Sequence, residues 1–193
     1  MEQSLLTLDL ATATGWCASG PGRELAFGLL RLSKTGDDIG RFLEEYERWL
    51  ELVCDEWGFD WIVFESPVLP PSRKDPRTGK VQSVTNITTL RKTYGLAAVT
   101  ELTARRRKIA YAEVHQGTYR KHFIGIGGGR PGKEMKAMAV AMCQALGLDI
   151  KDHNVAEAVA LHHYTTSKQP SIYTTLPKDL PELEGLFAGR PAA

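Results

Sequence analysis

The sequence has no excess of either charge and no long apolar run. Lys and Arg number 24 against 23 Asp and Glu, so the formal net charge is +1, and the overall charge gives no argument for a nucleic-acid or membrane partner. No stretch approaches the ~20 apolar residues that span a bilayer, and the start MEQSLLTLDL has too short an apolar run for a signal peptide. We expect a cytoplasmic protein with no membrane partner.

Cysteines are also few. Cys17, Cys54 and Cys143 are widely spaced, and none has a metal-ligand neighbour at CxxC or CxxH distance. This usage excludes a disulfide framework and fits a reducing compartment. The chain of 193 residues is 42% hydrophobic and 24% charged, which is typical of one soluble domain that buries roughly 70% of its unfolded surface.

Hydrophobic periodicity predicts a mixed α/β protein. Short apolar or extended segments indicate strands, and apolar residues spaced by three and four indicate amphipathic helices. We expect strands at residues 4–9, 16–18, 24–32, 61–64 and 109–114, and helices at 38–57, 86–106, 133–146 and 152–164. A short basic helix or turn and a glycine-rich loop precede Lys133.

Two segments show no sustained period. Residues 66–85 are rich in proline and basic side chains, and a connection of that length is usually functional or disordered. We expect a mobile basic loop beside Glu65. Residues 165–193 hold four more prolines and are expected to be extended or only partly ordered. The predicted division is therefore one domain at 1–164 and a proline-rich tail at 165–193.

Acidic residues follow two of the predicted strands. Asp9 ends the first strand and Glu65 ends the strand at 61–64, so adjacent strands would place the two side by side. Near the start of the last helix, Asn154 and Glu157 are three apart and share a face, with Asp152 just before them. Asp152 has a second interpretation as the cap of that helix.

Converging carboxylates repel one another unless a cation lies between them. Mg²⁺ or Mn²⁺ binds such oxygen ligands, and two ions about 3.5–4 Å apart could activate water and stabilise the leaving oxygen in phosphodiester cleavage. The pattern therefore favours a hard-metal site, although a single aspartate after a strand is more often a turn or cap residue.

Five segments together resemble a known family. They are LTLDLATATGW, the strand ending in Phe64-Glu65-Ser66, LRKTYGLAAVTEL, FIGIGGGRPGKEMKAMAV and DHNVAEAVALHHY. In this order they resemble the RuvC-type Holliday-junction resolvases of the ribonuclease H-like (retroviral integrase) superfamily, over about residues 4–164. The proline-rich segment after Glu65 is more similar to phage or prophage relatives. The resemblance implies a ribonuclease H-like α/β fold with a mixed central sheet of about five strands and helices on both faces.

The resemblance also implies the metal ligands. Asp9 and Glu65 match two carboxylate ligands of the family, whose last motif has two aspartates three apart where this chain has Asn154 and Glu157. Asp152 ranks above Asn154 because an anionic oxygen binds a hard cation better. The expected catalytic and metal-binding set is Asp9, Glu65, Asp152 and Glu157, with Asn154 as an alternative, holding Mg²⁺ or Mn²⁺ as two ions.

Basic residues complete the expected site. Lys133 falls at the family's basic residue after the glycine-rich loop, where a cation would contact phosphate or stabilise transition-state charge. A solvated lysine at a helix start is the alternative. The glycine-rich loop lacks the GxxxxGK[ST] pattern of a nucleotide site. The residues expected to contact DNA are Arg73, Lys74, Arg77, Lys80, Arg91, Lys92, Arg120, Lys121, Arg130 and Lys133.

The resemblance implies a homodimeric, metal-dependent endonuclease that resolves four-way DNA junctions, because two symmetric nicks need two sites. The helix carrying Leu90, Tyr94 and Ala98 is a candidate dimer interface. Two alternatives stay open. Asn154 in place of an acid favours a DNA-structure-binding protein with a defective metal site, and LDLATATGW loosely resembles a phosphate motif of actin-like or sugar-kinase ATPases, although these need two such domains.

Overall fold

A five-stranded mixed sheet forms the centre of the protein. The computed structural model describes residues 3–36, 38–67, 72–74, 81–83 and 86–172. The strands are β1 (Leu5–Asp9), β2 (Ala13–Ser19), β3 (Ala26–Arg31), β4 (Trp61–Glu65) and β7 (Ala110–Val114), in the spatial order β3-β2-β1-β4-β7. The first three strands pair antiparallel, and β4 lies parallel to both β1 and β7. The predicted mixed α/β sheet is thus confirmed.

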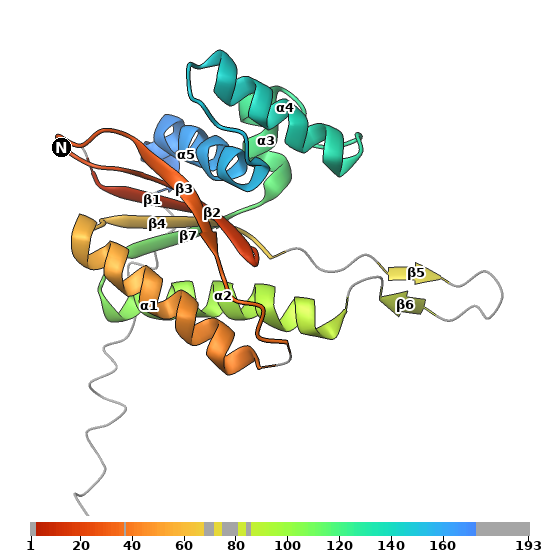
Figure 1. Cartoon of the computed structure of the whole chain (residues 1–193). Coiled ribbons are helices and arrows are strands. Elements are labelled where there is room, and N and C mark those ends of the chain that lie inside the picture. The colour runs from red at the N-terminus through yellow and green to blue at the C-terminus, as the bar shows by residue number, and fades with distance from the viewer. Residues whose placement is uncertain (1–2, 37, 68–71, 75–80, 84–85, 173–193) are drawn as a thin grey trace, which may run out of the picture.

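Helices cover both faces of this sheet (Figure 1). On one face lie α1 (Ile39–Trp57) and α2 (Ile87–Arg106), and on the other lie α3 (Gln116–Ile124), α4 (Gly132–Ala145) and α5 (His153–Ile172). The local signals behave as expected, because the Asn86 side chain caps α2 by accepting from the Thr88 amide, and Gly58 ends α1 at φ +60°. Among the described residues, no helix is long and apolar enough to cross a membrane.

The segments without a period differ from the expectation. The interval 66–85 contains β5 (Ser72–Lys74) and β6 (Val81–Ser83), which pair antiparallel as a separate sheet. The composition of this interval did not predict these strands, because a strand of three residues is too short to show a hydrophobic period. Arg73 and Lys74 lie in β5, whereas Arg77 and Lys80 lie outside the described residues.

The last helix is longer than predicted. It continues past Tyr164 to Ile172, so residues 165–172 are helical rather than extended. Thr165 is buried and its hydroxyl donates to the Leu161 carbonyl, which means that packing carries the helix beyond the point where the apolar period fades. Residues 173–193 of the predicted tail lie outside the described residues.

The face under α1 and α2 is an apolar core. Phe42, Tyr46 and Leu50 of α1 are fully buried against sheet residues including Ile62 and Phe64. The hydroxyl of Tyr46 lies 2.7 Å from that of Thr100 in α2, which ties the two helices together. This face is neutral where it is buried.

The opposite face brings α5 close to the sheet. Small side chains line its buried surface, among them Ala156, Ala158 and Ala160. Thr7 of β1 donates a 2.8 Å hydrogen bond to the Ala158 carbonyl. A Cβ on Gly15 of β2 would lie 1.9 Å from the Asn154 carbonyl oxygen, so the start of α5 can approach β2 only beside a glycine. This contact places α5 over the carboxyl end of β1.

Candidate active site

Two carboxylates meet at the carboxyl edge of the sheet. The register pairs Leu8 of β1 with Phe64 of parallel β4, so Asp9 and Glu65 follow at neighbouring strand ends, as predicted. Burial, and then the negative charges of Glu65 and Glu157, raise the pKa of Asp9 well above its ordinary value. Its carboxylate accepts no hydrogen bond from the described residues. Three acidic side chains therefore crowd one another here.

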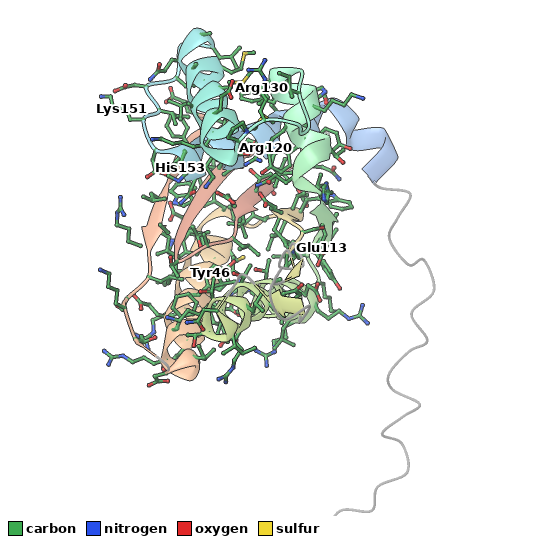
Figure 2. All side chains as sticks on the ribbon, turned by 90° about the vertical axis from the view of Figure 1, so that its right-hand side faces the viewer. Tyr46, Glu113, Arg120, Arg130, Lys151 and His153 are labelled. Carbon is green, nitrogen blue, oxygen red and sulfur yellow. The ribbon has the colours of Figure 1, made fainter. Side chains whose placement is uncertain are left out.

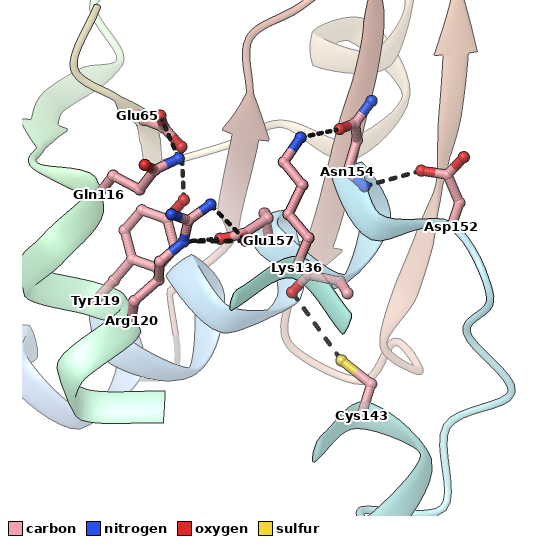
Figure 3. A network of polar contacts seen from close by, with 10 residues as sticks. Glu65, Gln116, Tyr119, Arg120, Lys136, Cys143, Asp152, Asn154 and Glu157 are labelled. Atoms are coloured by element: carbon pink, nitrogen blue, oxygen red, sulfur yellow. Dashed lines mark hydrogen bonds and ion pairs between the residues drawn. The ribbon is translucent and has the colours of Figure 1, made fainter. Parts of the chain in front are cut away.

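Glu65 is held by a single helix. The Tyr119 hydroxyl donates to Glu65 Oε2 at 2.5 Å, and Gln116 Nε2 donates to Oε1 at 3.0 Å. Figure 3 shows both donors on α3, facing Glu65. Burial raises the pKa of Glu65, the Tyr119 hydrogen bond opposes this, and the charge of Glu157 adds to the rise.

Glu157 is buried in an ion pair with Arg120. The glutamate side chain is 1% exposed and the arginine 8%, and Arg120 donates from Nη2 at 2.7 Å and from Nε at 3.0 Å. The prediction that Arg120 contacts DNA at the surface disagrees with this burial, since its guanidinium is committed to Glu157 inside the protein. Removing either partner would leave an unpaired buried charge.

Asp152 and Asn154 play different parts at the start of α5. Asp152 Oδ1 accepts from the Asn154 amide at 2.8 Å, while its Oδ2 lies 4.0 Å from Arg31. This is the capping interpretation, and Figure 3 shows Asp152 on the far side of Asn154 from Glu65 and Glu157. Asn154 donates to the Ala13 carbonyl at 2.7 Å and faces Lys136, whose Nζ is 3.5 Å from its Oδ1. Asn154, rather than Asp152, therefore lies on the side of Glu65 and Glu157.

Lys136 is a lysine whose charge acts on the carboxylate of Asp9. Lys133 is exposed in the first turn of α4, whereas Lys136, one turn further, lies close enough for its charge to oppose the rise in the Asp9 pKa. Its spacing of three from Lys133 and from buried Ala139 was a signal in the sequence, because that spacing places it at the border of the buried helix face.

The remaining predicted DNA contacts among the described residues of the helices lie on α2, on α3 and just before α4. Arg91 is exposed on α2, and Lys92 Nζ lies 4.8 Å from the centroid of the Phe42 ring. Lys121 is exposed on α3, and Arg130 pairs with Glu134 at the start of α4. Arg91 and Lys92 thus belong to the helix layer opposite α3 and α4.

Sequence reasoning missed Tyr119 and Gln116 altogether. The segment was predicted only as a short helix or turn, and its apolar period is weak. The spacing of 116, 119 and 120 would place three polar groups on one face if a helix were assumed. Nothing in that spacing identifies Glu65, which is 54 residues from Tyr119 in the chain.

The donor chemistry suits a hard divalent cation. Within the described residues, no group of three or more His, Cys, Asp or Glu side chains is arranged to hold a metal ion. Asp9 and Glu65 nevertheless supply neighbouring carboxylate oxygens. The pKa of Asp9 is raised, and a bound cation would lower it again. Glu157 is already neutralised by Arg120. The residues present therefore fit a metal centred on Asp9 and Glu65.

Comparisons with known proteins identify the fold. No family model and no curated protein matches the sequence. The structure of Thermus thermophilus RuvC is similar at a TM-score of 0.57 and 12% identity, covering 87% of this chain and 97% of that one. T. thermophilus RuvC in complex with a Holliday junction substrate is similar at a TM-score of 0.57 and 10% identity, covering 86% and 95%.

A third similar structure is the yeast mitochondrial Holliday junction resolvase Ydc2. Its TM-score is 0.46 at 12% identity, covering 86% of this chain and 85% of that one. The two RuvC structures, together with the mixed five-stranded sheet, show that the chain has a ribonuclease H-like α/β fold. The predicted fold class is confirmed.

Proposed function

We propose that this protein is a metal-dependent endonuclease that cuts branched DNA, with the four-way junction as its principal substrate. The observation that carries the proposal is the meeting of Asp9, Glu65 and Glu157 at the carboxyl edge of a ribonuclease H-like sheet. The similar T. thermophilus RuvC was solved with a Holliday junction substrate, which supports the choice of substrate. The proline-rich segment supports a phage or prophage type of resolvase.

Asp9 and Glu65 would hold Mg²⁺ or Mn²⁺, with Glu157 beside them. When bound, the ion would supply a Lewis acid and a water of lowered pKa for attack on the scissile phosphate. The chain itself would hold the carboxylates in place through α3 and would keep Glu157 charged through Arg120. Because Arg120 already neutralises one carboxylate, one ion per site agrees better with this donor set than the two ions expected from the sequence.

Positive side chains would bind the DNA backbone. Lys136 extends over Asn154 and would contact the phosphate next to the metal, with Lys133 further out on the same helix. Lys121 and Arg130 would lengthen this surface from α3 and the glycine-rich loop. Contacts of this kind release counterions, so binding would weaken with rising salt. Six basic residues between Glu65 and the middle of α2 remain predicted DNA contacts: Arg73, Lys74, Arg77, Lys80, Arg91 and Lys92.

A homodimer would supply the two sites that paired nicks require. The outer surface of α2 carries Ile87, Tyr94 and Leu102 with exposed fractions of 67%, 40% and 45%. Exposed apolar residues at helical spacing are typical of a helix that packs against a partner. We assign the dimer contact to this surface of α2, which includes the predicted Tyr94 and Ala98.

The test is cleavage of a labelled four-way junction beside a linear duplex of the same sequence, with Mg²⁺, Mn²⁺ or chelator. We expect paired symmetric nicks that need metal and disappear in Asp9→Asn. The control is Asp149→Asn, because Asp149 is an exposed acid that pairs with Lys151 at the surface. Equal cleavage by Asp9→Asn and wild type would contradict the proposal.

A second function has its own support in the site. Asn154 stands where an acid was expected, and Arg120 occupies Glu157, so the site could bind junctions without cutting them. Tight junction binding in the same experiment, with no cleavage in either metal, would favour this structure-binding protein and exclude the nuclease.

A further inference from the structure

Both oxygens of Glu65 receive a hydrogen bond from α3. Tyr119 donates to Oε2 at 2.5 Å and Gln116 donates to Oε1 at 3.0 Å. The two donors are three residues apart and so lie on one face of the helix. Tyr119 is 0% exposed, which leaves its hydroxyl little freedom to turn away. Each oxygen of the Glu65 carboxylate therefore accepts its own hydrogen bond from α3 (Figure 3).

These two hydrogen bonds determine the orientation of the Glu65 carboxylate. The last torsion of a glutamate is broad and roughly two-fold, so one donor alone would leave the group free to rock. Each ionised oxygen accepts at about two positions, and each uses one of them for its α3 donor. Each Glu65 oxygen therefore keeps one free acceptor position. Beside it lies the carboxylate of Asp9, which accepts no hydrogen bond from the described residues.

The hydroxyl of Tyr119 is the donor in this contact, because the oxygens of an ionised Glu65 carboxylate can only accept. Burial, and then the negative charges of Glu65, Glu157 and Asp9, raise the pKa of Tyr119 well above its ordinary value. The ring is buried and its hydroxyl bonds Glu65, so Tyr119 is an outer partner of the carboxylate and not a ligand of the ion. The outer partners of metal-binding carboxylates act in this way, and their loss typically lowers metal affinity by 10–100-fold.

We propose that Tyr119, assisted by Gln116, is a positioning residue that holds the Glu65 carboxylate in the orientation in which it binds a divalent cation together with Asp9. The inference rests on the proposed function, because the positioned carboxylate serves the metal of that reaction. It adds a dependence on α3 that the carboxylates alone do not imply. Tyr119 touches neither the metal nor the DNA.

The test is Mn²⁺ binding to the metal-free full chain, measured by titration calorimetry for wild type, Tyr119→Phe and Asp9→Asn. Phenylalanine keeps the buried ring and removes only the donor. We expect the Kd for Mn²⁺ to rise about tenfold in Tyr119→Phe. The Mn²⁺ concentration needed for half-maximal cleavage should rise in parallel, with the rate at saturating Mn²⁺ close to wild type.

A matched control separates positioning from general stability. Tyr46→Phe also removes a fully buried hydroxyl, one that lies 2.7 Å from Thr100 on the opposite face of the sheet. We expect it to leave the Kd for Mn²⁺ unchanged while lowering the thermal midpoint at least as much as Tyr119→Phe does. Gln116→Ala, at a half-buried site, should raise the Kd by less than Tyr119→Phe.

The failures can be told apart. If wild type binds Mn²⁺ and Asp9→Asn does not, but Tyr119→Phe binds as tightly as Tyr46→Phe, the positioning role is overturned and the proposed metal site stands. If wild type and Asp9→Asn are alike in binding no Mn²⁺, the metal site is wrong and the role of Tyr119 fails with it.

Discussion

The two faces of the sheet bury the same kind of side chain in opposite surroundings. Tyr46 of α1 and Tyr119 of α3 are both 0% exposed. Tyr46 faces the neutral hydroxyl of Thr100, whereas Tyr119 donates to the carboxylate of Glu65. Figure 2 shows Tyr46 and Arg120 on opposite sides of the sheet. One face buries neutral groups, and the other buries charges.

This difference separates stability from function. A buried ion pair is rarely more stabilising than apolar residues of the same volume, because both charges lose their hydration. The Arg120–Glu157 pair therefore gives the α3–α5 face little net stability, and its presence there needs another explanation. The proposed metal binding and phosphate chemistry would supply one, since both need charge held in place.

The largest effect should come from the neutral face. Phe42→Ala removes a fully buried ring and should lower the free energy of unfolding by about 3–5 kcal/mol, measured by denaturant titration. Cleavage per folded molecule should be unchanged. Leu52→Ala, on the exposed side of the same helix, is the control and should change stability by less than about 0.5 kcal/mol. A fall in cleavage per folded molecule would contradict the division between the faces.

Breaking the buried ion pair should be almost as costly. Arg120→Met leaves Glu157 uncompensated and should lower the free energy of unfolding by about 3–5 kcal/mol, whereas the double variant with Glu157→Gln should recover most of the loss. The control is Arg106→Met, because its pair with Glu47 is exposed and should contribute less than about 1 kcal/mol. Equal losses for the single and double variants would show that packing, not charge, holds Arg120.

His162 offers a pH test on the charged face, at a distance from the carboxylates. Burial, and then the charge of His163, lower the pKa of His162 to about 4 from 6.5, and its Nε2 lies 2.8 Å from the Ser19 hydroxyl. The unfolded chain binds the proton first, so stability is lost as pH falls from about 6.5 towards 4. Between pH 7 and pH 5 this loss amounts to about 2 kcal/mol.

The measurement is the free energy of unfolding of wild type and His162→Gln at both pH values. The variant should lose about 2 kcal/mol less than wild type over this interval. His153→Gln, at an exposed position, should follow wild type. Parallel losses in His162→Gln and wild type would show that His162 is not a buried neutral group in the folded protein.

The smallest effect should be a gain. Asp9 is crowded by two other carboxylates, and its raised pKa reflects a penalty on its charged form. Asp9→Asn removes that charge, so the metal-free variant should be more stable than wild type at neutral pH, within about 1 kcal/mol. Thermal unfolding in chelator measures this. A lower midpoint for Asp9→Asn would place Asp9 among the groups that stabilise the fold.

The local patterns of the chain were sufficient for much of the architecture. Short apolar runs located the five strands of the main sheet and three-to-four spacing located the long helices, because burial leaves a trace in the hydrophobic pattern. The strand ends placed Asp9 and Glu65 at the edge of the sheet, and the pairing of β1 with β4 made them neighbours. The strands β5 and β6 and the last turns of α5 were missed, since pairing and packing there override a weak period.

The side chains around the carboxylates were the least predictable part. Lys136 rather than Lys133 faces the cluster, Asp152 caps α5, and Arg120 is buried rather than exposed. Each of these depends on the rotation of a helix about its own axis relative to the sheet. A shift of one residue turns a helix by about 100° and exchanges the inner and outer side chains.

The amino-acid order alone determined that Asp9 and Glu65 would each end a strand, because strand position follows from the local hydrophobic pattern. Only the tertiary structure decided which groups meet those acids. Tyr119 reaches Glu65 across 54 positions of the chain, and Arg120 reaches Glu157 across 37. Such contacts arise from the packing of α3 against α5 beside the end of β4, and packing between segments so far apart in the chain has no signature in a single sequence.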